Sequence, residues 1–216
     1  MFLDENTRTE IRKRFQSLVK PVKIVLFTQE LGCQYCRETK QLLGELSELS
    51  DKITIEVYNL ITDKEKVEEY RVDKAPAMAI VGDRDYGIRY YGVPSGYEFA
   101  SLLEDIEMVS TGEHGLSTET LEKLKDLTEP VHLQVFVTPT CPYCPSAVLT
   151  AHALSFVNDN ITADMVEAQE FMDLSERYNV RGVPRVVINE KHHFEGALPE
   201  ENYVDAVLHA AVAEAN

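Results

Sequence analysis

A set of motifs that recurs at a constant offset constrains the fold of this chain more than any other feature of its sequence. Two Cys-x-x-Cys motifs, Cys33–Cys36 and Cys141–Cys144, stand 108 positions apart. The segment Tyr70–Pro76 has its tyrosine, valine and proline repeated at the same offset in Tyr178–Pro184. Such self-similarity is typical of a chain built from copies of one structural unit. The sequence therefore predicts two units of the same fold.

The pattern of apolar residues predicts the same order of strands and helices in both units. Runs rich in β-branched and aromatic residues are typical of strands, and apolar residues three or four positions apart are typical of helices. Strands are expected at 22–28, 53–58, 77–81 and about 88–91, and again at 133–138, 162–167, 185–188 and about 193–195. In the first unit, helices are expected at about 5–19, from the cysteine pair through Leu49, at 64–70 and at 97–106. In the second unit they are expected at 117–127, from the cysteine pair to 157, at 171–178 and at 200–212. This order predicts an α/β fold in which each unit is a central mixed β-sheet flanked by helices.

A short polar segment separates the two predicted units. Residues 110–115 are small, polar and glycine-rich, which is typical of a linker. Ser117 follows at a position where its hydroxyl would cap the next helix. We therefore expect an N-terminal unit over residues 1–115 and a C-terminal unit over residues 116–216, each with its own cysteine pair.

The charge of the chain disfavours two classes of partner. It has 37 acidic and 21 basic residues, a formal net charge of −16, and no cluster of Lys and Arg. Such a surface would repel nucleic acids and anionic membranes, so neither is expected as a partner. The first twenty residues contain neither a secretory signal nor a membrane-spanning stretch, and the cytoplasm is the expected compartment. In a reducing cytoplasm, cysteine pairs are catalytic or metal-binding more readily than structural.

The surroundings of each cysteine pair predict its chemistry. A strand leads into each motif and a helix follows, which places the first sulfur beside free backbone N–H groups at the positive end of the helix. Both effects favour the thiolate. The second cysteine lies one helical turn further on, close enough to attack a mixed disulfide that the first has formed. We therefore expect Cys33 and Cys141 to be nucleophiles, and Cys36 and Cys144 to resolve the mixed disulfides.

Other interpretations of the cysteines stay open. Two Cys-x-x-Cys pairs supply enough thiolates for one zinc ion, which would make the chain a zinc-stabilised interaction module. Zinc ribbons, however, usually bring their pairs within about 15 to 20 residues of each other. Inert structural disulfides, or a chaperone-like binding protein with incidental thiols, are further alternatives. The repeat favours the redox interpretation, in which no metal or cofactor is expected.

A proline about 40 residues after each motif strengthens the redox interpretation. Pro76 and Pro184 each follow a predicted helix and open a predicted strand. A single proline there would need no explanation, because proline is tolerated at the first residue of a strand. Two at matching positions are better explained by cis prolines whose loops face the sulfurs and leave a backbone edge free for a substrate peptide. The predicted substrate loops are Ala75–Pro76 and Val183–Pro184.

These motifs resemble those of a known family. The Cys-Pro-Tyr-Cys sequence of residues 141–144 together with Val183–Pro184 is similar to the active site of glutaredoxins, and residues 33–36 with Ala75–Pro76 are a variant of it. The tandem arrangement resembles the protein disulfide oxidoreductases of thermophilic archaea and bacteria, which have two thioredoxin-fold units. The resemblance implies reduction, oxidation and isomerisation of protein disulfides, with recharging by a thioredoxin-reductase-like flavoprotein. The alternative within the redox class is a pair of electron-relay domains that feeds a peroxidase.

The chain departs from the thioredoxin pattern in its proton acceptor. Thioredoxins have a buried Asp six residues before the first cysteine, but Phe27 and Val135 occupy these positions here. Glu167, at the end of a predicted core strand, is the candidate that replaces it. The position that matches Glu167 in the first unit is Asn59, which does not ionise. We therefore expect the two centres to differ, with the proton acceptor only in the second.

Overall fold

The computed structural model describes residues 2–214 of the chain. The strands are β1 (Val22–Thr28), β2 (Ile53–Asn59), β3 (Ala77–Val81), β4 (Asp85–Tyr91), β5 (Val131–Val137), β6 (Ile161–Glu167), β7 (Arg185–Ile188) and β8 (His192–Glu195). The α-helices are α1 (Glu5–Arg14), α2 (Cys36–Ser47), α3 (Lys64–Tyr70), α4 (Glu98–Thr111), α5 (Thr118–Leu124), α6 (Cys144–Val157), α7 (Met172–Arg177) and α8 (Glu200–Glu214), and a 3-10 turn, η1, spans Phe15–Ser17. Within these residues no helix combines the length and apolar character needed to cross a membrane.

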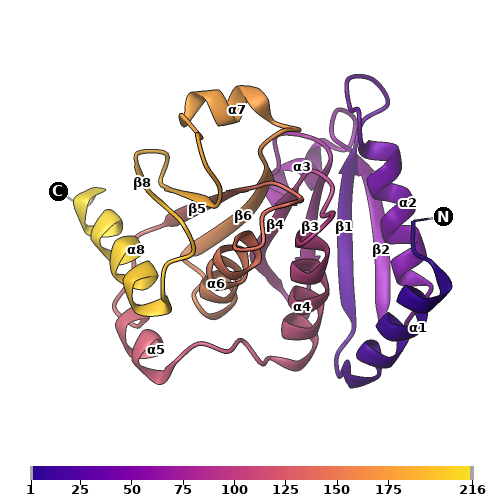
Figure 1. Ribbon diagram of the computed structural model, residues 1–216, viewed down its shortest axis with the longest axis horizontal. Helices are drawn as coiled ribbons and strands as arrows, with labels where there is room; N and C mark the ends of the chain where they lie inside the picture. The colour runs from indigo at the N-terminus through magenta and orange to yellow at the C-terminus, as the bar shows by residue number, and fades with distance from the viewer. Residues whose placement is uncertain (1, 215–216) are drawn as a thin grey trace.

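All eight strands form one mixed sheet, in the order β2-β1-β3-β4-β6-β5-β7-β8 (Figure 1). The first four belong to the first unit and the last four to the second, and the second set repeats the order of the first. The two sets join where β4 runs parallel to β6, with Ile88 opposite Ala163 and Tyr91 opposite Val166. The N-terminal and C-terminal ends of the chain consequently lie at opposite ends of the long axis (Figure 1). The predicted α/β class with two tandem thioredoxin-like units is confirmed.

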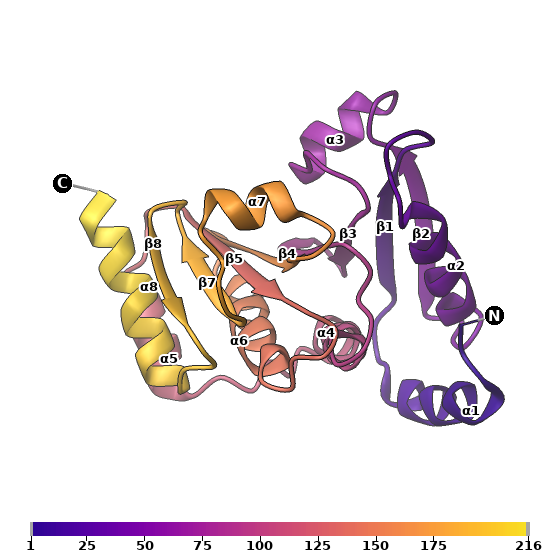
Figure 2. The ribbon, with the colours of Figure 1, turned by 45° about the horizontal axis from the view of Figure 1, so that its top comes forward.

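Helices cover the two faces of the sheet unequally, as Figure 2 shows. One face is packed by α1, α2, α4, α5, α6 and α8 around a large apolar core that includes Leu43, Leu102 and Val148 and runs through both units. The opposite face has only α3 and α7, above a smaller core that includes Phe27 and Phe136. Alternate residues of each strand point to the two faces, so most residues of the inner strands are buried, whereas the edge strands β2 and β8 are mostly half-buried or exposed.

Helix α6 connects the two units on the larger face. It packs against α4 and over β4, both from the first unit, as well as over its own β5 and β6. Its residues Val148, Ala151 and Leu154 are fully buried, which explains why the helix is apolar on most of its surface. The second cysteine pair therefore stands at the junction of the units, and the first pair stands near one end of the sheet.

Several boundaries differ from the expected ones for physical reasons. Helix α4 continues to Thr111 instead of ending near Ile106, because Ile106 and Val109 extend its buried face, and it ends at Gly112 in the left-handed conformation (φ +84°). The predicted linker thus loses its first two residues. Helix α1 is shorter than expected, since its last turn tightens into η1 at Phe15. Strand β4 begins three residues early, at Asp85. The division at residue 115 stays a prediction.

Candidate active sites

Both cysteine pairs lie where a parallel strand ends and a helix begins. Cys33 follows β1, and Cys36 is the first residue of α2; Cys141 follows β5, and Cys144 is the first residue of α6. Each pair is closed as a disulfide within its own motif, with the two Cα atoms 5.5 Å apart. Because β1 and β5 run in the same direction through the sheet, both centres stand at the edge where these strands have their carboxyl ends.

The sulfurs differ in their access to solvent. In the first centre Cys33 is half-buried and Cys36 is 6% exposed. In the second centre Cys141 is 7% exposed and Cys144 is fully buried. The first cysteine of each pair is thus the more accessible one, which supports its predicted role as nucleophile. The backbone N–H of Gln29 also donates to Sγ of Cys36 at 3.4 Å, a contact that favours negative charge on this sulfur.

The predicted substrate loops lead into the strands that pair with β1 and β5. Pro76 and Pro184 directly precede β3 and β7, which are the antiparallel partners of β1 and β5, and the peptide bond before each proline is cis. The carbonyl of Pro76 accepts from Gly92 N–H at 3.0 Å, and that of Pro184 from Gly196 N–H at 2.8 Å. By contrast, within residues 2–214 the N–H and C=O groups of the preceding residues, Ala75 and Val183, make no backbone hydrogen bond. These free groups are what an added substrate strand would need.

Glu167 lies at the end of β6, on the face of the sheet that α6 covers. It has the same orientation as Ala163 and Met165, which pack in the larger core. Burial raises the pKa of its carboxyl group. Its Oε2 accepts the N–H of Glu170 at 2.6 Å, whereas its Oε1 is buried and has no hydrogen-bond partner within the described residues. The carboxyl is therefore on the same face and at the same edge as Cys144, and its role as proton acceptor stays a prediction.

A second buried carboxyl group lies near this centre and was not predicted from the sequence. Glu98 is the first residue of α4 and is 1% exposed, and burial raises its pKa to about 7. Its Oε2 accepts from the Ser101 hydroxyl at 2.8 Å, and its Oε1 has no partner in the described part of the chain. The preceding residue, Tyr97, donates its N–H to the carbonyl of Pro139, two residues before Cys141. Glu98 therefore belongs to the first unit but lies beside the second centre.

A second group of buried polar side chains lies further along α4. Asp105, two turns further, accepts from the hydroxyl of Tyr90 and lies 2.5 Å from Nδ1 of His152 on α6. All three side chains are fully buried. The sequence contains a sign of this buried group, because polar residues 98, 101 and 105 recur at helical spacing within an otherwise apolar helix. The same spacing is expected of a polar stripe that faces solvent, and only the packing of α6 on α4 distinguishes the two.

Comparisons with known proteins agree with this geometry. A family model for the thioredoxin domain matches residues 131–209. The crystal structure of a protein disulfide oxidoreductase from Aeropyrum pernix superposes with a TM-score of 0.92 and 34% sequence identity, over 99% of this chain and 95% of that one. The NTD_N/C domain of alkylhydroperoxide reductase AhpF from Enterococcus faecalis has the same fold, with a TM-score of 0.88 and 24% identity over 95% of this chain and all of that one.

A longer relative contains a similar segment. The F component of the alkyl hydroperoxide reductase of Escherichia coli strain K12 is 27% identical over 198 residues, which are 91% of this chain and 36% of that protein. The chain thus spans about a third of the length of this relative. The match to the A. pernix protein, by contrast, covers nearly the whole of both chains. In this chain, both cysteine pairs form disulfides within thioredoxin-like units. The chain belongs to the protein disulfide oxidoreductases that are built from two thioredoxin-like units in tandem.

Proposed function

We propose that the chain is a protein dithiol/disulfide oxidoreductase that reduces, oxidises and isomerises disulfides of client proteins through both centres. The observation that carries this proposal is the same at each centre: an intramotif disulfide stands beside a loop whose Ala75 or Val183 backbone groups are free to pair with a peptide. The proposal places the chain in the cytoplasm, where other thiol systems keep the centres supplied with electrons.

The exchange transfers two electrons in two steps. In the reduced second centre, the Cys141 thiolate attacks one sulfur of a client disulfide, forms a mixed disulfide and releases the other client sulfur as a thiolate. Cys144 then loses its proton and attacks Sγ of Cys141, which closes the intramotif disulfide and releases the second client thiolate. The client disulfide is thereby reduced to two thiols and the centre is oxidised. Oxidation of a client dithiol is the same sequence in reverse.

The second step requires a group that accepts the proton of Cys144. Two buried carboxyl groups, Glu98 and Glu167, lie at the same edge and on the same face of the sheet as this sulfur. Their raised pKa values suit a group that exchanges protons near neutral pH. We propose that Glu167, as the sequence suggests, or Glu98, as the packing of α4 suggests, performs this role; in the first unit Asn59 stands at the position of Glu167 and cannot accept the proton.

Reduction of insulin tests the proposal. The chain, with dithiothreitol as electron donor, is expected to accelerate the precipitation of insulin B chains well above the rate with dithiothreitol alone. A variant with all four cysteines replaced by serine should lose this acceleration and keep its fold by circular dichroism. If that variant accelerated precipitation as well as the unmodified chain, the thiols would be incidental and the chaperone-like interpretation would replace ours.

An electron relay is the second candidate function, and the similarity to part of an alkyl hydroperoxide reductase favours it. In this case a thioredoxin-reductase-like flavoprotein would reduce one centre, and the chain would pass the electrons to a peroxidase. The test couples NADPH, a thioredoxin reductase, the chain and a thiol peroxidase, with consumption of hydrogen peroxide as the readout. Peroxide consumption that depends on the chain, together with no effect on insulin, would favour the relay over the protein disulfide oxidoreductase.

A further inference from the structure

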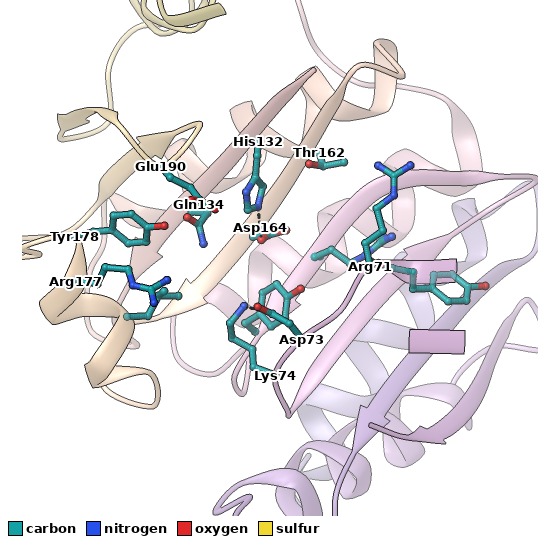
Figure 3. A pocket seen from close by; sticks show the side chains of 14 residues that line it. Arg71, Asp73, Lys74, His132, Gln134, Thr162, Asp164, Arg177, Tyr178 and Glu190 are labelled. Atoms are coloured by element: carbon teal, nitrogen blue, oxygen red, sulfur yellow. Dashed lines mark hydrogen bonds and ion pairs between the residues drawn. The ribbon is translucent and has the colours of Figure 1, made fainter. Parts of the chain in front are cut away.

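Strand β6 has two buried acidic residues, Asp164 and Glu167, which face opposite sides of the sheet. Asp164 lines a polar cavity of about 260 Å³ between α3 and α7, and Figure 3 shows the ring of His132 directed towards it. Nε2 of His132 lies 2.6 Å from its carboxylate. Burial alone would raise the pKa of Asp164, but the charge and the hydrogen bond of His132 outweigh burial and lower it. A buried carboxylate thus keeps its charge where a cation faces it.

Glu167, at the end of the same strand, lacks a partner of this kind. It is 3% exposed, and burial raises the pKa of its carboxyl group, to which no Lys, Arg or His among the described residues contributes. Oε2 accepts the N–H of Glu170 at 2.6 Å, whereas Oε1 has no hydrogen-bond partner within residues 2–214. A buried carboxyl group that no cation faces is more stable with its proton than without it.

The side chain of Glu170 turns back to the same place. Its Oε1 accepts the N–H of Val93, in the segment after β4, at 2.8 Å. Its Oε2 is buried and, in the part of the chain that the structure describes, has no partner either. Burial raises the pKa of Glu170 to about 7, and the charge of Glu167 adds to this effect. Each of the two acids therefore has one oxygen bound to a backbone N–H and one oxygen that needs a partner.

Gly92 is the point at which these two side chains meet. It directly follows β4 and has a φ of +98°, a conformation that favours glycine. A Cβ atom on residue 92 would stand 2.7 Å from Cβ of Glu167 and 3.1 Å from Oε1 of Glu170. Both acidic side chains thus contact the same glycine, and a larger residue there would displace them. Gly92 and Val93 belong to the first unit, so the first unit holds together two acids of the second.

We propose that Glu167 and Glu170 share one proton, which lies between Oε1 of Glu167 and Oε2 of Glu170. One proton satisfies both oxygens, because the oxygen that carries it donates and the other accepts. A hydrated metal ion does not fit in its place, since the two oxygens have almost no accessible surface. Nor is any group of three or more His, Cys, Asp or Glu side chains within residues 2–214 arranged to hold a metal.

The shared proton also bears on the second centre, and this part rests on the proposed role of Glu167 as proton acceptor. Two neighbouring carboxylates repel each other, so the pair without its proton is a stronger base than one carboxylate alone. It takes the proton of Cys144 as the sulfur of Cys144 forms its bond with Sγ of Cys141. The bond between Cys141 and the client sulfur breaks, and the client leaves as a thiolate with the electron pair. Glu170 acts through Glu167 and is therefore a positioning residue.

Other ionisable groups lie on this face of the sheet. Glu98 begins α4, and Asp105 of α4 and His152 of α6 lie deeper in the core. Cys141 and Cys144 do not titrate while they form a disulfide. Among the described residues, none of these groups adds a charge that shifts the pKa of either member of the pair. The pair is thus expected to titrate as a unit of its own.

NMR of the oxidised chain, isotope-labelled at the carboxyl carbon of glutamate, tests the shared proton without reference to activity. The two groups should titrate together in two steps, the later one at about pH 7 or above. In Glu170→Gln, Glu167 should titrate in one step, at least about one pH unit below that later step, because the second charge is gone. Glu167→Gln should change Glu170 in the same way, and it supplies the test if Glu170→Gln does not fold. Glu176→Gln is the control, since Glu176 is exposed on α7, and both steps should stay in place.

The rate of disulfide closure at the second centre tests the positioning role. The reduced Cys33→Ser/Cys36→Ser chain is mixed with a disulfide-linked peptide, and the mixed disulfide is followed by acid quenching and mass spectrometry over a range of pH. The closure rate should rise as the pair loses its proton. Additional Glu170→Gln should move this rise about one pH unit lower and reduce the rate reached at high pH, because a single carboxylate is the weaker base. Additional Glu176→Gln should leave the profile unchanged.

The two measurements separate the possible failures. If substitution of one glutamate leaves the titration of the other unchanged, the two groups do not share a proton and the proposal is overturned. Coupled titration with an unchanged closure profile in Glu170→Gln would support the shared proton and overturn the positioning role. In that case Glu167 would not be the acceptor of the proposed exchange, and Glu98 would remain as the candidate.

Discussion

Three carboxyl groups on α4 and at the end of β6 have raised pKa values and lie on the side of the second centre. Glu98 and Glu170 each have a pKa that burial raises to about 7, and that of Glu167 is also raised. Glu170 accepts the N–H of Val93 from the first unit at 2.8 Å, so this carboxyl also stands at the junction of the units. Only Glu167 could be proposed from the sequence, because its place at the end of a strand is visible in the pattern. The burial of Glu98 and Glu170 depends on contacts with the other unit, which no local pattern reveals.

These carboxyl groups make the stability of the chain depend on pH. An unfolded Glu98 loses its proton near pH 4.5, but the folded chain keeps it up to about pH 7. Folding therefore binds a proton between these values, and the free energy of unfolding decreases as the pH rises from about 4.5 to 7. We expect Glu98→Gln to be more stable than the unmodified chain at pH 8, by about 1 to 2 kcal/mol, and about equally stable at pH 4.5.

Urea unfolding at the two pH values measures this effect. Glu113→Gln is the control, since Glu113 is an exposed residue of the segment between α4 and α5. The control should change the free energy of unfolding at neither pH. A Glu98→Gln variant that is less stable than the unmodified chain at pH 8 would show that the ionised carboxylate is stabilising, and the account of its burial would be wrong.

At the scale of elements, helix α6, which begins at Cys144, is held by the other unit through a buried hydrogen bond between His152 and Asp105. His152 on α6 and Asp105 on α4 are both fully buried, and Tyr90 of β4 donates to the same carboxylate. Removal of one partner leaves the other without compensation in the core. We expect His152→Leu to lower the free energy of unfolding by about 3 kcal/mol. Replacement of both Asp105 and His152 by leucine should recover a large part of this loss, because no buried charge then remains.

Chemical denaturation of the single and double variants measures the expected effect. Lys123→Ala is a suitable control, because the ion pair of Lys123 with Asp205 joins α5 and α8 at the surface. It should leave stability unchanged within error. A double variant that is less stable than His152→Leu alone would contradict this explanation. It would mean that the contact between Asp105 and His152 itself stabilises the fold, and that the stability lost in His152→Leu does not come from an uncompensated charge.

The elements themselves were largely predictable, and their lateral order was not. The repeat allowed each element predicted in one half to be compared with its counterpart in the other. Strands such as β1 and β5 could therefore be placed from the sequence, together with the cysteine pairs that follow them. The extension of α4 to Thr111 was missed because its polar residues Ser110 and Thr111 look like a linker, although Ser110 is buried and its hydroxyl donates to the carbonyl of Lys20. The helix boundary was set by a tertiary contact that sequence periodicity does not contain.

At the scale of the whole molecule, the two units share one sheet and the cores on both of its faces. Strand β4 pairs with β6, and the larger core includes residues from both units. A sequence repeat predicts two copies of a fold, but it does not say which edges of the two sheets meet. The polar cavity between α3 and α7 was for the same reason not recognised, because His132 and Gln134 of β5 line it together with Arg89 of β4 only when β4 lies next to β6.

Separation of the two halves tests this shared architecture. Residues 1–115 alone would expose the edge of β4, and residues 116–216 alone would expose the edge of β6 and the face of α6 that packs on α4. We expect each fragment to be much less stable than the intact chain, and an equimolar mixture to form a one-to-one complex by analytical ultracentrifugation. The opposite result would be two fragments that do not associate and that each unfold cooperatively at the temperature of the intact chain. That result would show that the units are independent.

We propose that the two centres perform dithiol/disulfide exchange unequally. The second centre combines Pro142 within its motif, a free Val183 backbone and the buried carboxyl groups beside Cys144, whereas the first has no carboxyl group in the position of Glu167. The most direct test compares insulin reduction by Cys33→Ser/Cys36→Ser and by Cys141→Ser/Cys144→Ser at equal concentration. We predict that loss of the second pair removes most of the activity and that loss of the first removes less; a larger loss on removal of the first pair would contradict the account.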